Sequence, residues 1–440
     1  MPAYSDMTTS IRDKMNNKYI VVLSILIGTI LEWYDFSLLA SMATIISVIF
    51  FPSKNAALSL MATFGVFASG FLMRPIGGAL FGHIGDRYGR KEALSLTIIL
   101  MAVPTTLIGL LPTFHAIGIV APIILVFLRL IQGAASSGEY PGAICFLTEI
   151  APVDKRGLWG SASMIGVVGG VFLGTLVNFL LSSNLSEQQL YSWGWRIPFL
   201  TGLPLGALGW LMRYKISETA VYKAAKATQK TLLFPLSHVF RFSYSNLIKI
   251  IILFSASTVI FYSNFVYVMT YLVRTHEISF RQSLLDNMLG VTALIIFIPF
   301  FGYLSDKLNR KLIILIGALC LSLFSYPIFV LLLNQNLWGQ ILSALFLAIF
   351  VGPLAATAAE VFSTCMRYSG ISISLNVGAS IFGGTSPLIA TYLVYYSGHE
   401  TMPAIYAATL GVICFFTILS MKSNLPDDIL KNKIPTSLEV

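Results

Sequence analysis

Long apolar runs, separated by short polar, charged or Pro/Gly-containing breaks, fill most of this 440-residue chain. A helix that crosses the roughly 30 Å hydrocarbon core of a bilayer needs about 20 mostly apolar residues. Twelve runs are that long, over residues 20–51, 57–82, 93–112, 117–149, 157–182, 193–214, 247–273, 283–305, 312–333, 338–362, 368–395 and 403–421. The sequence therefore predicts an all-α integral membrane protein with twelve transmembrane helices.

The charged residues are few and unevenly distributed. Only 11% of the chain is charged and 56% is hydrophobic, yet the formal net charge is +9. Of the 28 Lys and Arg residues, 22 fall in the N-terminal tail (1–18), in every second loop, in a central segment from Arg213 to Lys249 that contains the central loop (215–246), and in the C-terminal tail (422–440). By the positive-inside rule, both tails and the central loop are expected to be cytoplasmic. The chain is too apolar to offer a basic face to nucleic acid, so no nucleic-acid partner is expected.

The chain contains an internal repeat. Gly-His-Ile-Gly-Asp86-Arg87-Tyr-Gly-Arg90-Lys, after the second run, recurs as Gly-Tyr-Leu-Ser-Asp306-Lys-Leu-Asn-Arg310-Lys after the eighth. Glu149 with Arg156 after the fourth run likewise corresponds to Glu360 with Arg367 after the tenth. Parallel repeats of this kind are typical of transporters built from two bundles. We expect one six-helix bundle over 19–214 and a second over 247–421.

Motifs for other chemistry are lacking. The four cysteines lie in apolar stretches without a CxxC spacing or a paired His, which argues against disulfides and a zinc site. The sequence has no HExxH or GxSxG motif. We therefore expect no enzyme activity, no metal and no cofactor. A receptor would need a large soluble output segment, and the longest candidate is the central loop.

Six further motifs, in order along the chain, carry a family resemblance. They are Glu32-Trp-Tyr34-Asp35-Phe, Arg74-Pro-Ile-Gly, Arg129-Leu-Ile-Gln132-Gly with Gly-Glu139-Tyr, Trp-Arg196-Ile-Pro-Phe, Thr-Tyr271-Leu, and Glu360-Val-Phe with Arg367 leading to Asn376. With the repeated loop, they make the chain similar to the major facilitator superfamily. More narrowly, the chain resembles the metabolite:proton symporter family, which includes proline/betaine, oxoglutarate, citrate and shikimate carriers.

The resemblance implies a proton-coupled symporter that moves a small carboxylate-bearing or zwitterionic metabolite by alternating access. It also implies a multi-pass protein of the bacterial cytoplasmic (inner) membrane that acts as a monomer. The expected partners are a small-molecule substrate with a carboxylate, protons and membrane lipid. The alternatives are an uncoupled facilitator or exchanger of an organic acid, and a transport-like membrane receptor.

Three acidic residues inside the spans are candidates for proton coupling. Glu32 and Asp35 lie three residues apart and share a helix face, and Glu139 lies in the fourth span. A carboxylate at membrane depth is costly and is usually functional. Asp35 is the first candidate, with Glu32 and Glu139 beside it; the alternative for Asp35 and Glu32 is a static buried ion pair.

Substrate binding is assigned to polar side chains of both halves. Arg129 has a planar fork suited to a carboxylate, either that of a substrate or that of Asp35 or Glu139. Arg129, Gln132, Ser136 and Glu139 are spaced three, four and three residues apart, so they form one stripe that faces an interior. The other candidate substrate ligands are Tyr34, Asn264, Tyr267, Tyr271 and Asn376. For the aromatic residues of the seventh span, core or interface packing is an equal alternative.

The repeated loops predict a cytoplasmic gate. An acid near a helix N-terminus with Arg nearby can close one side of a transporter and open when the bundles move apart. A solvated basic loop is the alternative, but two matching copies argue against it. The predicted gate residues are Asp86, Arg87, Arg90, Glu149, Arg156, Asp306, Arg310, Glu360 and Arg367.

Overall fold

The computed structural model describes residues 3–54, 56–227, 235–275 and 278–421, and within these ranges all regular structure is helical. The N-terminal half contains α1 (Ala3–Ser41), α2 (Ala43–Phe50), α3 (Ala56–Arg87), α4 (Arg90–Leu110), α5 (Phe114–Ile117), α6 (Val120–Ile150), η1 (Val153–Lys155), α7 (Arg156–Asn184), α8 (Glu187–Gln189), η2 (Leu190–Gly194), α9 (Arg196–Leu200) and α10 (Gly202–Tyr214). α1 begins at Ala3, so the helix extends into the segment expected to be a tail.

Two short helices, α11 (Ala220–Ala227) and α12 (Pro235–Phe242), connect the halves. The C-terminal half contains α13 (Tyr244–Tyr262), η3 (Ser263–Tyr267), α14 (Val268–Thr275), α15 (Phe280–Lys307), α16 (Arg310–Leu333), α17 (Leu337–Val351), α18 (Leu354–Val361), η4 (Thr364–Met366), α19 (Arg367–Gly378), η5 (Ala379–Gly383), α20 (Ser386–Ser397) and α21 (Met402–Leu419). The predicted C-terminal tail, 422–440, lies outside the described residues.

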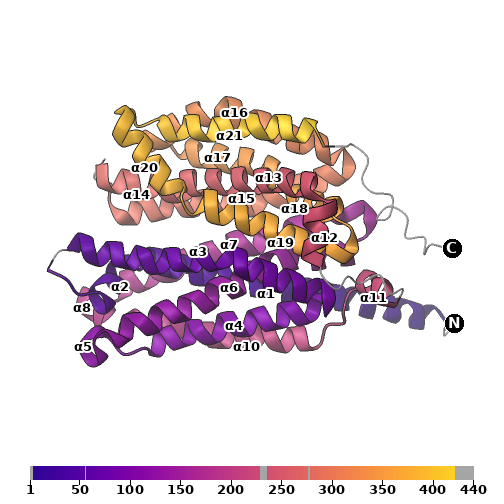
Figure 1. Ribbon diagram of the computed structural model, residues 1–440, viewed down its shortest axis with the longest axis horizontal. Helices are drawn as coiled ribbons and strands as arrows, with labels where there is room; N and C mark the ends of the chain where they lie inside the picture. Colours follow the sequence, from indigo (N-terminus) through magenta and orange to yellow (C-terminus); the bar gives the residue numbers. More distant parts are fainter. Residues whose placement is uncertain (1–2, 55, 228–234, 276–277, 422–440) are drawn as a thin grey trace.

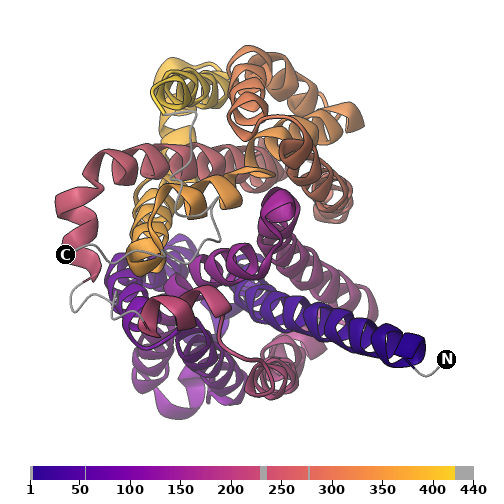
Figure 2. The ribbon, with the colours of Figure 1, turned by 90° about the vertical axis from the view of Figure 1, so that its right-hand side faces the viewer.

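The helices form two bundles that lie side by side, one from each half of the chain (Figures 1 and 2). Four features lie at the same end of the molecule: the start of α1, the end of α21, and the two connecting helices α11 and α12. Helices α5 and α8 lie at the opposite end (Figure 1). The bundles contact each other chiefly through α3 with α19 and through α7 with α15. Counted as apolar runs of the sequence, each pair joins the second run of one half (α3 or α15) to the fifth run of the other (α19 or α7). Two copies of one architecture are expected to give this pairing.

Small residues allow the helices of the N-terminal bundle to approach closely. Gly166, Gly170 and Gly174 of α7 face α1, where an added Cβ would lie 2.8 Å from Thr29 Cβ, from Trp33 Cβ and from Ser37 Cβ, respectively. Close approach through a stripe of small residues is the usual packing of membrane helices. The glycine spacing in the fifth span therefore serves helix packing.

Ten helical stretches in the described part of the chain are long and apolar enough to cross a membrane, and α3 and α10 are not among them. Large apolar side chains also point outward, including Leu72 and Ile76 of α3, which are 75% and 62% exposed. Such surfaces suit lipid rather than water. Several spans expected to be continuous are interrupted: the first changes helix at Met42, and π-turns divide the seventh at η3 and the eleventh at η5.

Candidate functional site

A pocket lies inside the N-terminal bundle and is lined by four of its helices. α1 contributes Glu32, Asp35, Phe36 and Leu39, α3 contributes Phe67, Gly70, Phe71 and Arg74, α4 contributes Met101, and α6 contributes Arg129, Gln132, Gly133 and Ser136. The side of this pocket formed by α6 matches the polar stripe expected from the sequence, up to Ser136. At Gly133 the α6 backbone approaches Gly70 of α3 so closely that a Cβ would overlap the carbonyl there.

Asp35 is the centre of a hydrogen-bond network in this pocket. Its carboxylate accepts from Arg129 Nη1 at 2.6 Å, from Gln132 Nε2 at 3.0 Å and from Thr105 Oγ1 at 2.9 Å. Gln132 Nε2 also lies 2.7 Å from Thr105 Oγ1. The side chains come from α1, α4 and α6, so the Asp35 carboxylate links three helices. Thr105 was not expected from the sequence.

Glu32 lies in the same pocket and faces Arg74 of α3. The two groups form an ion pair at 3.6 Å, and both are buried. The Arg74 guanidinium also lies over aromatic rings, 4.9 Å from the centroid of Phe71 and 5.8 Å from those of Trp33 and Phe36. α3 continues as a helix through Pro75, so the Arg-Pro pair does not end it.

Glu139 is separate from this pocket. It forms an ion pair with Arg213, near the end of α10, and accepts from Thr97 Oγ1 at 2.5 Å. Arg213 also donates to the carbonyl of Leu94 and is 1% exposed. The expectation that the α6 stripe faces one interior as far as Glu139 is therefore wrong: helix α6 carries this residue toward α4 and α10. Arg213, counted as a loop residue from the sequence, is buried.

The candidate residues of the C-terminal half do not line this pocket. Asn264 donates to Ser343 Oγ at 2.7 Å. Tyr267 and Tyr271 stack on each other with centroids 5.5 Å apart, and Tyr271 donates to Glu400 at 2.8 Å.

Two further candidates are held by carbonyl groups. Asn376 of α19 donates across the bundle interface to the carbonyl of Ser137 at 2.7 Å. Tyr34 donates to the carbonyl of Pro198 at 2.9 Å, within the N-terminal bundle. Neither residue reaches the pocket around Asp35.

Asp86 joins the two bundles at the end of the molecule where α11 and α12 lie. Its carboxylate accepts from the backbone N–H groups of Tyr368 at 3.2 Å and Ser369 at 2.9 Å, at the start of α19. Arg90 Nη1 donates to Asp86 at 2.7 Å, and Arg90 Nη2 donates to the carbonyl of Thr364 at 2.7 Å. A carboxylate at a helix N-terminus is stabilised by the free N–H groups and by the helix dipole.

Asp306 makes the equivalent contacts in the opposite direction. It accepts from the N–H groups of Gly157 at 2.7 Å and Leu158 at 2.8 Å, at the start of α7, and from Arg310 at 2.8 Å. The twofold relation between the halves thus places one carboxylate of each half on a helix of the other.

Cross-bundle ion pairs complete this arrangement. Glu149 accepts from Arg367 at 2.8 Å and from Arg90 at 3.3 Å, while Glu360 pairs with Arg310 and lies 4.0 Å from Arg156. Each Glu of the repeated Glu/Arg pair therefore meets the Arg of the other half. We call these eight residues the latch: Asp86, Arg90, Glu149, Arg156, Asp306, Arg310, Glu360 and Arg367.

Arg87 does not take part in the latch contacts; its guanidinium lies 5.5 Å from the ring centroid of Tyr88. The segment around α11 contributes instead. Thr219 Oγ1 donates to Glu149 at 2.6 Å, and Tyr222 donates to the carbonyl of Arg87 at 2.8 Å. Burial raises the pKa of the nearby Glu218 carboxyl, although the N–H groups of Thr219 and Lys91 donate to it.

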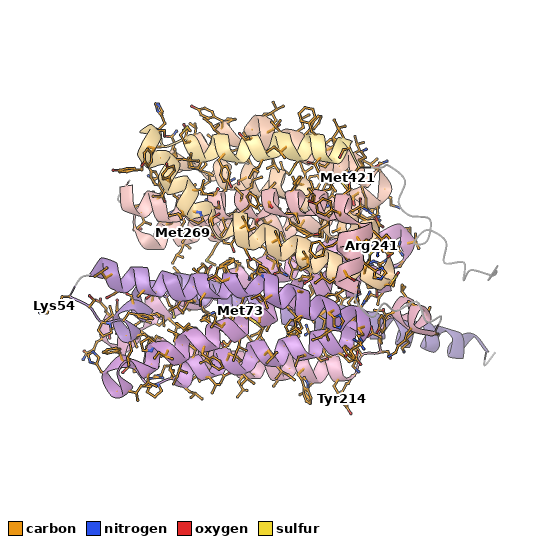
Figure 3. All side chains as sticks on the ribbon, viewed as in Figure 1. Lys54, Met73, Tyr214, Arg241, Met269 and Met421 are labelled. Atoms are coloured by element: carbon orange, nitrogen blue, oxygen red, sulfur yellow. The ribbon has the colours of Figure 1, made fainter. Side chains whose placement is uncertain are left out.

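Figure 3 shows the two ends of the molecule, with Arg241 of α12 at the end with the latch and Lys54 at the opposite end. Helices α1, α3 and α6, which carry most of the pocket residues, run between these ends (Figure 1). In the described part of the chain no group of three or more His, Cys, Asp or Glu side chains is arranged to hold a metal ion. The site is a buried set of ion pairs in the N-terminal bundle, and the latch joins the two bundles at one end of the molecule.

Comparison with known proteins agrees with this architecture. The family model of the Major Facilitator Superfamily matches residues 25–375, so the chain belongs to this superfamily of membrane transport proteins. A protein of Staphylococcus aureus (strain COL), named as a proline/betaine transporter, is 36% identical over 418 residues, which is 93% of this chain and 89% of that protein. The proline/betaine transporter of Escherichia coli (strain K12) is 32% identical over 430 residues, covering 94% and 85% of the two chains.

The solved structures show the same fold. The proton:xylose symporter XylE bound to 6-bromo-6-deoxy-D-glucose superposes with a TM-score of 0.79 at 16% sequence identity, covering 94% of this chain and 98% of that one. The predicted superfamily is thus confirmed, and so are the predicted transport function and the multi-pass helical architecture.

Proposed function

We propose that the protein is a proton-coupled symporter for a zwitterionic metabolite of the proline/betaine class. The observation that carries this proposal is the Asp35 network: a buried carboxylate shared by Arg129, Gln132 and Thr105 in one pocket. The relatives named as proline/betaine transporters support the substrate class. The neighbour named as a proton:xylose symporter shares the fold and supplies an example of proton coupling on it.

The coupling follows from competition for Arg129. While Asp35 is ionised, it occupies the Arg129 guanidinium. A proton on Asp35 removes its charge, and Arg129 can then bind the carboxylate of a substrate. Release of the proton restores the internal pair and expels the substrate. Glu32, with its long ion pair to Arg74, is the second coupling group, and Glu139 the third, acting through Arg213 rather than through the pocket.

We infer a topology of twelve spans with the latch on the cytoplasmic side. The inferred parts are the N-terminal tail (1–18), the two bundles (19–214 and 247–421), the central loop (215–246) and the C-terminal tail (422–440). The basic residues of the alternate loops support this orientation. The protein would then lie in the bacterial cytoplasmic membrane as a monomer, surrounded by lipid.

In this orientation the latch is the cytoplasmic gate, and the structure corresponds to a state closed toward the cytoplasm. Opening requires the carboxylates of Asp86 and Asp306 to leave the N-termini of α19 and α7. Both cross-bundle ion pairs, Glu149–Arg367 and Glu360–Arg156, must also break. Arg87 belongs to the basic rim of this gate. Asn264, Tyr267, Tyr271 and Asn376 would complete the substrate site from the C-terminal half when the bundles rearrange, with Tyr34 supporting α1.

Uptake by the purified protein in proteoliposomes tests this function. We expect proline or trimethylglycine to accumulate when an inward proton gradient is imposed, and accumulation to stop when a protonophore collapses the gradient. In the same assay we expect Asp35→Asn to lose gradient-driven accumulation. Asp154→Asn, which changes an exposed carboxylate near the latch, is its matched control. Uptake that reaches only equilibrium, with or without the gradient, would favour the uncoupled facilitator, and binding without uptake would favour the receptor.

A further inference from the structure

The pocket contains buried polar atoms that lack hydrogen-bond partners, and they form two groups. Within the part of the chain that the structure describes, no group donates a hydrogen bond to either carboxylate oxygen of Glu32, although the residue is only 2% exposed. Nε and Nη2 of Arg129 donate none, and Oε1 of Gln132 accepts none. Buried charged and polar atoms of this kind need an opposite charge or a hydrogen-bond partner because desolvation is costly. One part of the pocket is therefore ready to receive a cation and another part an anion.

Arg74 occupies the cation-binding part. Its guanidinium lies within 5.8 Å of three ring centroids, those of Trp33, Phe36 and Phe71, and its ion pair with Glu32 is long, at 3.6 Å. A cation over several aromatic faces beside one carboxylate is the arrangement that proteins use to bind quaternary ammonium groups. Here the cation belongs to the protein itself.

Asp35 occupies the anion-binding part in the same way, through Arg129. Glu32 and Asp35 lie one helical turn apart on α1, so their Cβ atoms are separated by about 5–6 Å. Glu32, which can bind a cation, and Arg129, which can bind an anion, line the same pocket. The pocket thus holds an internal cation, Arg74, beside Glu32 and an internal anion, Asp35, beside Arg129, where a zwitterionic ligand would place its own two charges.

We propose that Glu32 and the rings of Trp33, Phe36 and Phe71 form the site for the methylated ammonium group of the substrate, and that Arg74 holds this site until the substrate displaces it. The proposal rests on the proposed function and specifies its substrate class. A primary ammonium brings three N–H groups that need acceptors, and aromatic rings are poor acceptors. A trimethylated nitrogen has no N–H group and loses nothing against the ring faces.

The C-terminal bundle covers the same rings. Tyr262 of α13 packs edge-on against Phe36, with centroids 6.2 Å apart, and Ser380 donates to the carbonyl of Phe71 at 3.1 Å. A substrate that displaces Arg74 from the rings therefore changes a surface on which the other bundle packs. Binding in one half can in this way be transmitted to the bundle interface.

A methylation series tests the proposal in the full-length protein. The ligands are glycine, N,N-dimethylglycine and N,N,N-trimethylglycine, which share one carboxylate. The variants are Phe71→Leu and, as a control, Phe81→Leu, which changes a buried Phe of the same helix outside the pocket. We expect wild-type affinity to rise with methylation, and Phe71→Leu to weaken trimethylglycine binding by about tenfold while glycine changes by less than about twofold. Phe81→Leu should match the wild type.

The outcomes separate this proposal from the proposed function. If the wild type transports proline or trimethylglycine with protons but Phe71→Leu weakens all three ligands equally, the ammonium site is wrong and the symporter remains. If the wild type neither binds nor transports any of these zwitterions, both are wrong. For the role of Arg74, we expect Arg74→Gln to bind trimethylglycine at least as tightly as the wild type. Loss of binding in an Arg74→Gln protein that still binds proline would overturn that role.

Discussion

The interior of the N-terminal bundle holds three acid–base pairs, Glu32–Arg74, Asp35–Arg129 and Glu139–Arg213, whereas the C-terminal bundle has amides and hydroxyls there. Asn264 pairs with Ser343, and Ser263 with Ser386. Among the described residues, the buried charges of the C-terminal half are Glu360 and Arg367, and both belong to the latch.

The latch, in contrast, is nearly the same in both halves. Asp86 and Asp306 each accept from two N–H groups at the start of a helix in the other bundle. Symmetric contacts suit a gate, because both bundles must be released by one movement. Asymmetric interiors suit coupled transport, because ionisable groups in one half can control a site that the other half only completes.

The largest expected effect is that of Asp35→Asn, which removes the central charge of the N-terminal interior. We expect proton-driven accumulation of substrate to be abolished, because Arg129 no longer has a titratable competitor. Exchange of substrate across the membrane should remain, since the amide can still accept from Thr105 and Gln132. Measurements of both activities in proteoliposomes check this, and accumulation at the wild-type level would exclude Asp35 as the coupling group.

The pair of Glu139 with Arg213 gives the next largest effect. Arg213→Gln leaves a fully buried carboxylate without its charge partner, and we expect a loss of about 3–5 kcal/mol in the free energy of unfolding. The double variant Glu139→Gln/Arg213→Gln should recover much of this loss. Lys215→Gln, at an exposed position two residues further, is the control.

Proton-driven uptake by the same double variant decides what the pair does. Retained coupling would make Glu139–Arg213 a structural pair and confine proton transfer to the pocket. A stable double variant that exchanges substrate but no longer accumulates it would instead support Glu139 as a coupling group. Either result sharpens the contrast between the charged interior and the neutral one.

The symmetry of the latch can be tested by comparing Asp86→Asn with Asp306→Asn. Asp86 and its partner Arg90 are fully buried, whereas the side chain of Arg310, the partner of Asp306, is 15% exposed. We therefore expect Asp86→Asn to cost about 2–3 kcal/mol of the closed state and Asp306→Asn about 1–2 kcal/mol.

Alkylation of Cys145 measures this opening. Cys145 is fully buried on α6, four residues before Glu149, and the other three cysteines can be replaced by Ser. The rate of alkylation should rise more in Asp86→Asn than in Asp306→Asn. Equal alkylation rates in the two variants would mean that the difference in burial has no energetic consequence. The Asp86 and Asp306 contacts of the latch would then be equivalent.

The sequence predicts the fold and the latch well because both depend on patterns that repeat. Apolar runs of sufficient length must be helices in lipid, and two copies of one loop identify residues such as Asp86 and Asp306 without a structure. The buried acids were also recognisable, since a carboxylate in an apolar run is rare. These signals are one-dimensional and survive without knowledge of packing.

The partners of these residues could not be predicted in the same way. Arg213 ends an apolar run and resembles any basic loop residue, so only the packing of α10 on α4 shows that it meets Glu139. Thr97 and Thr105 are two of many hydroxyls in apolar runs. The division of the α6 stripe between two environments depends on which helices surround it. Helix position alone cannot show this.

The smallest expected effect tests the neutral interior of the C-terminal half. Asn264→Ala removes one buried hydrogen bond, to Ser343 at 2.7 Å, and should cost about 1 kcal/mol in the free energy of unfolding. If this half only completes the substrate site, the KM for substrate should rise by less than about tenfold and the ratio of protons to substrate should stay unchanged. Ser343→Ala, which removes the other partner of the same bond, separates the two roles: a similar loss of stability without a change in KM would show that the Asn264 amide itself contacts substrate. A changed proton ratio in Asn264→Ala would instead show that coupling extends into the C-terminal bundle, and the charged and neutral interiors would then act as one site.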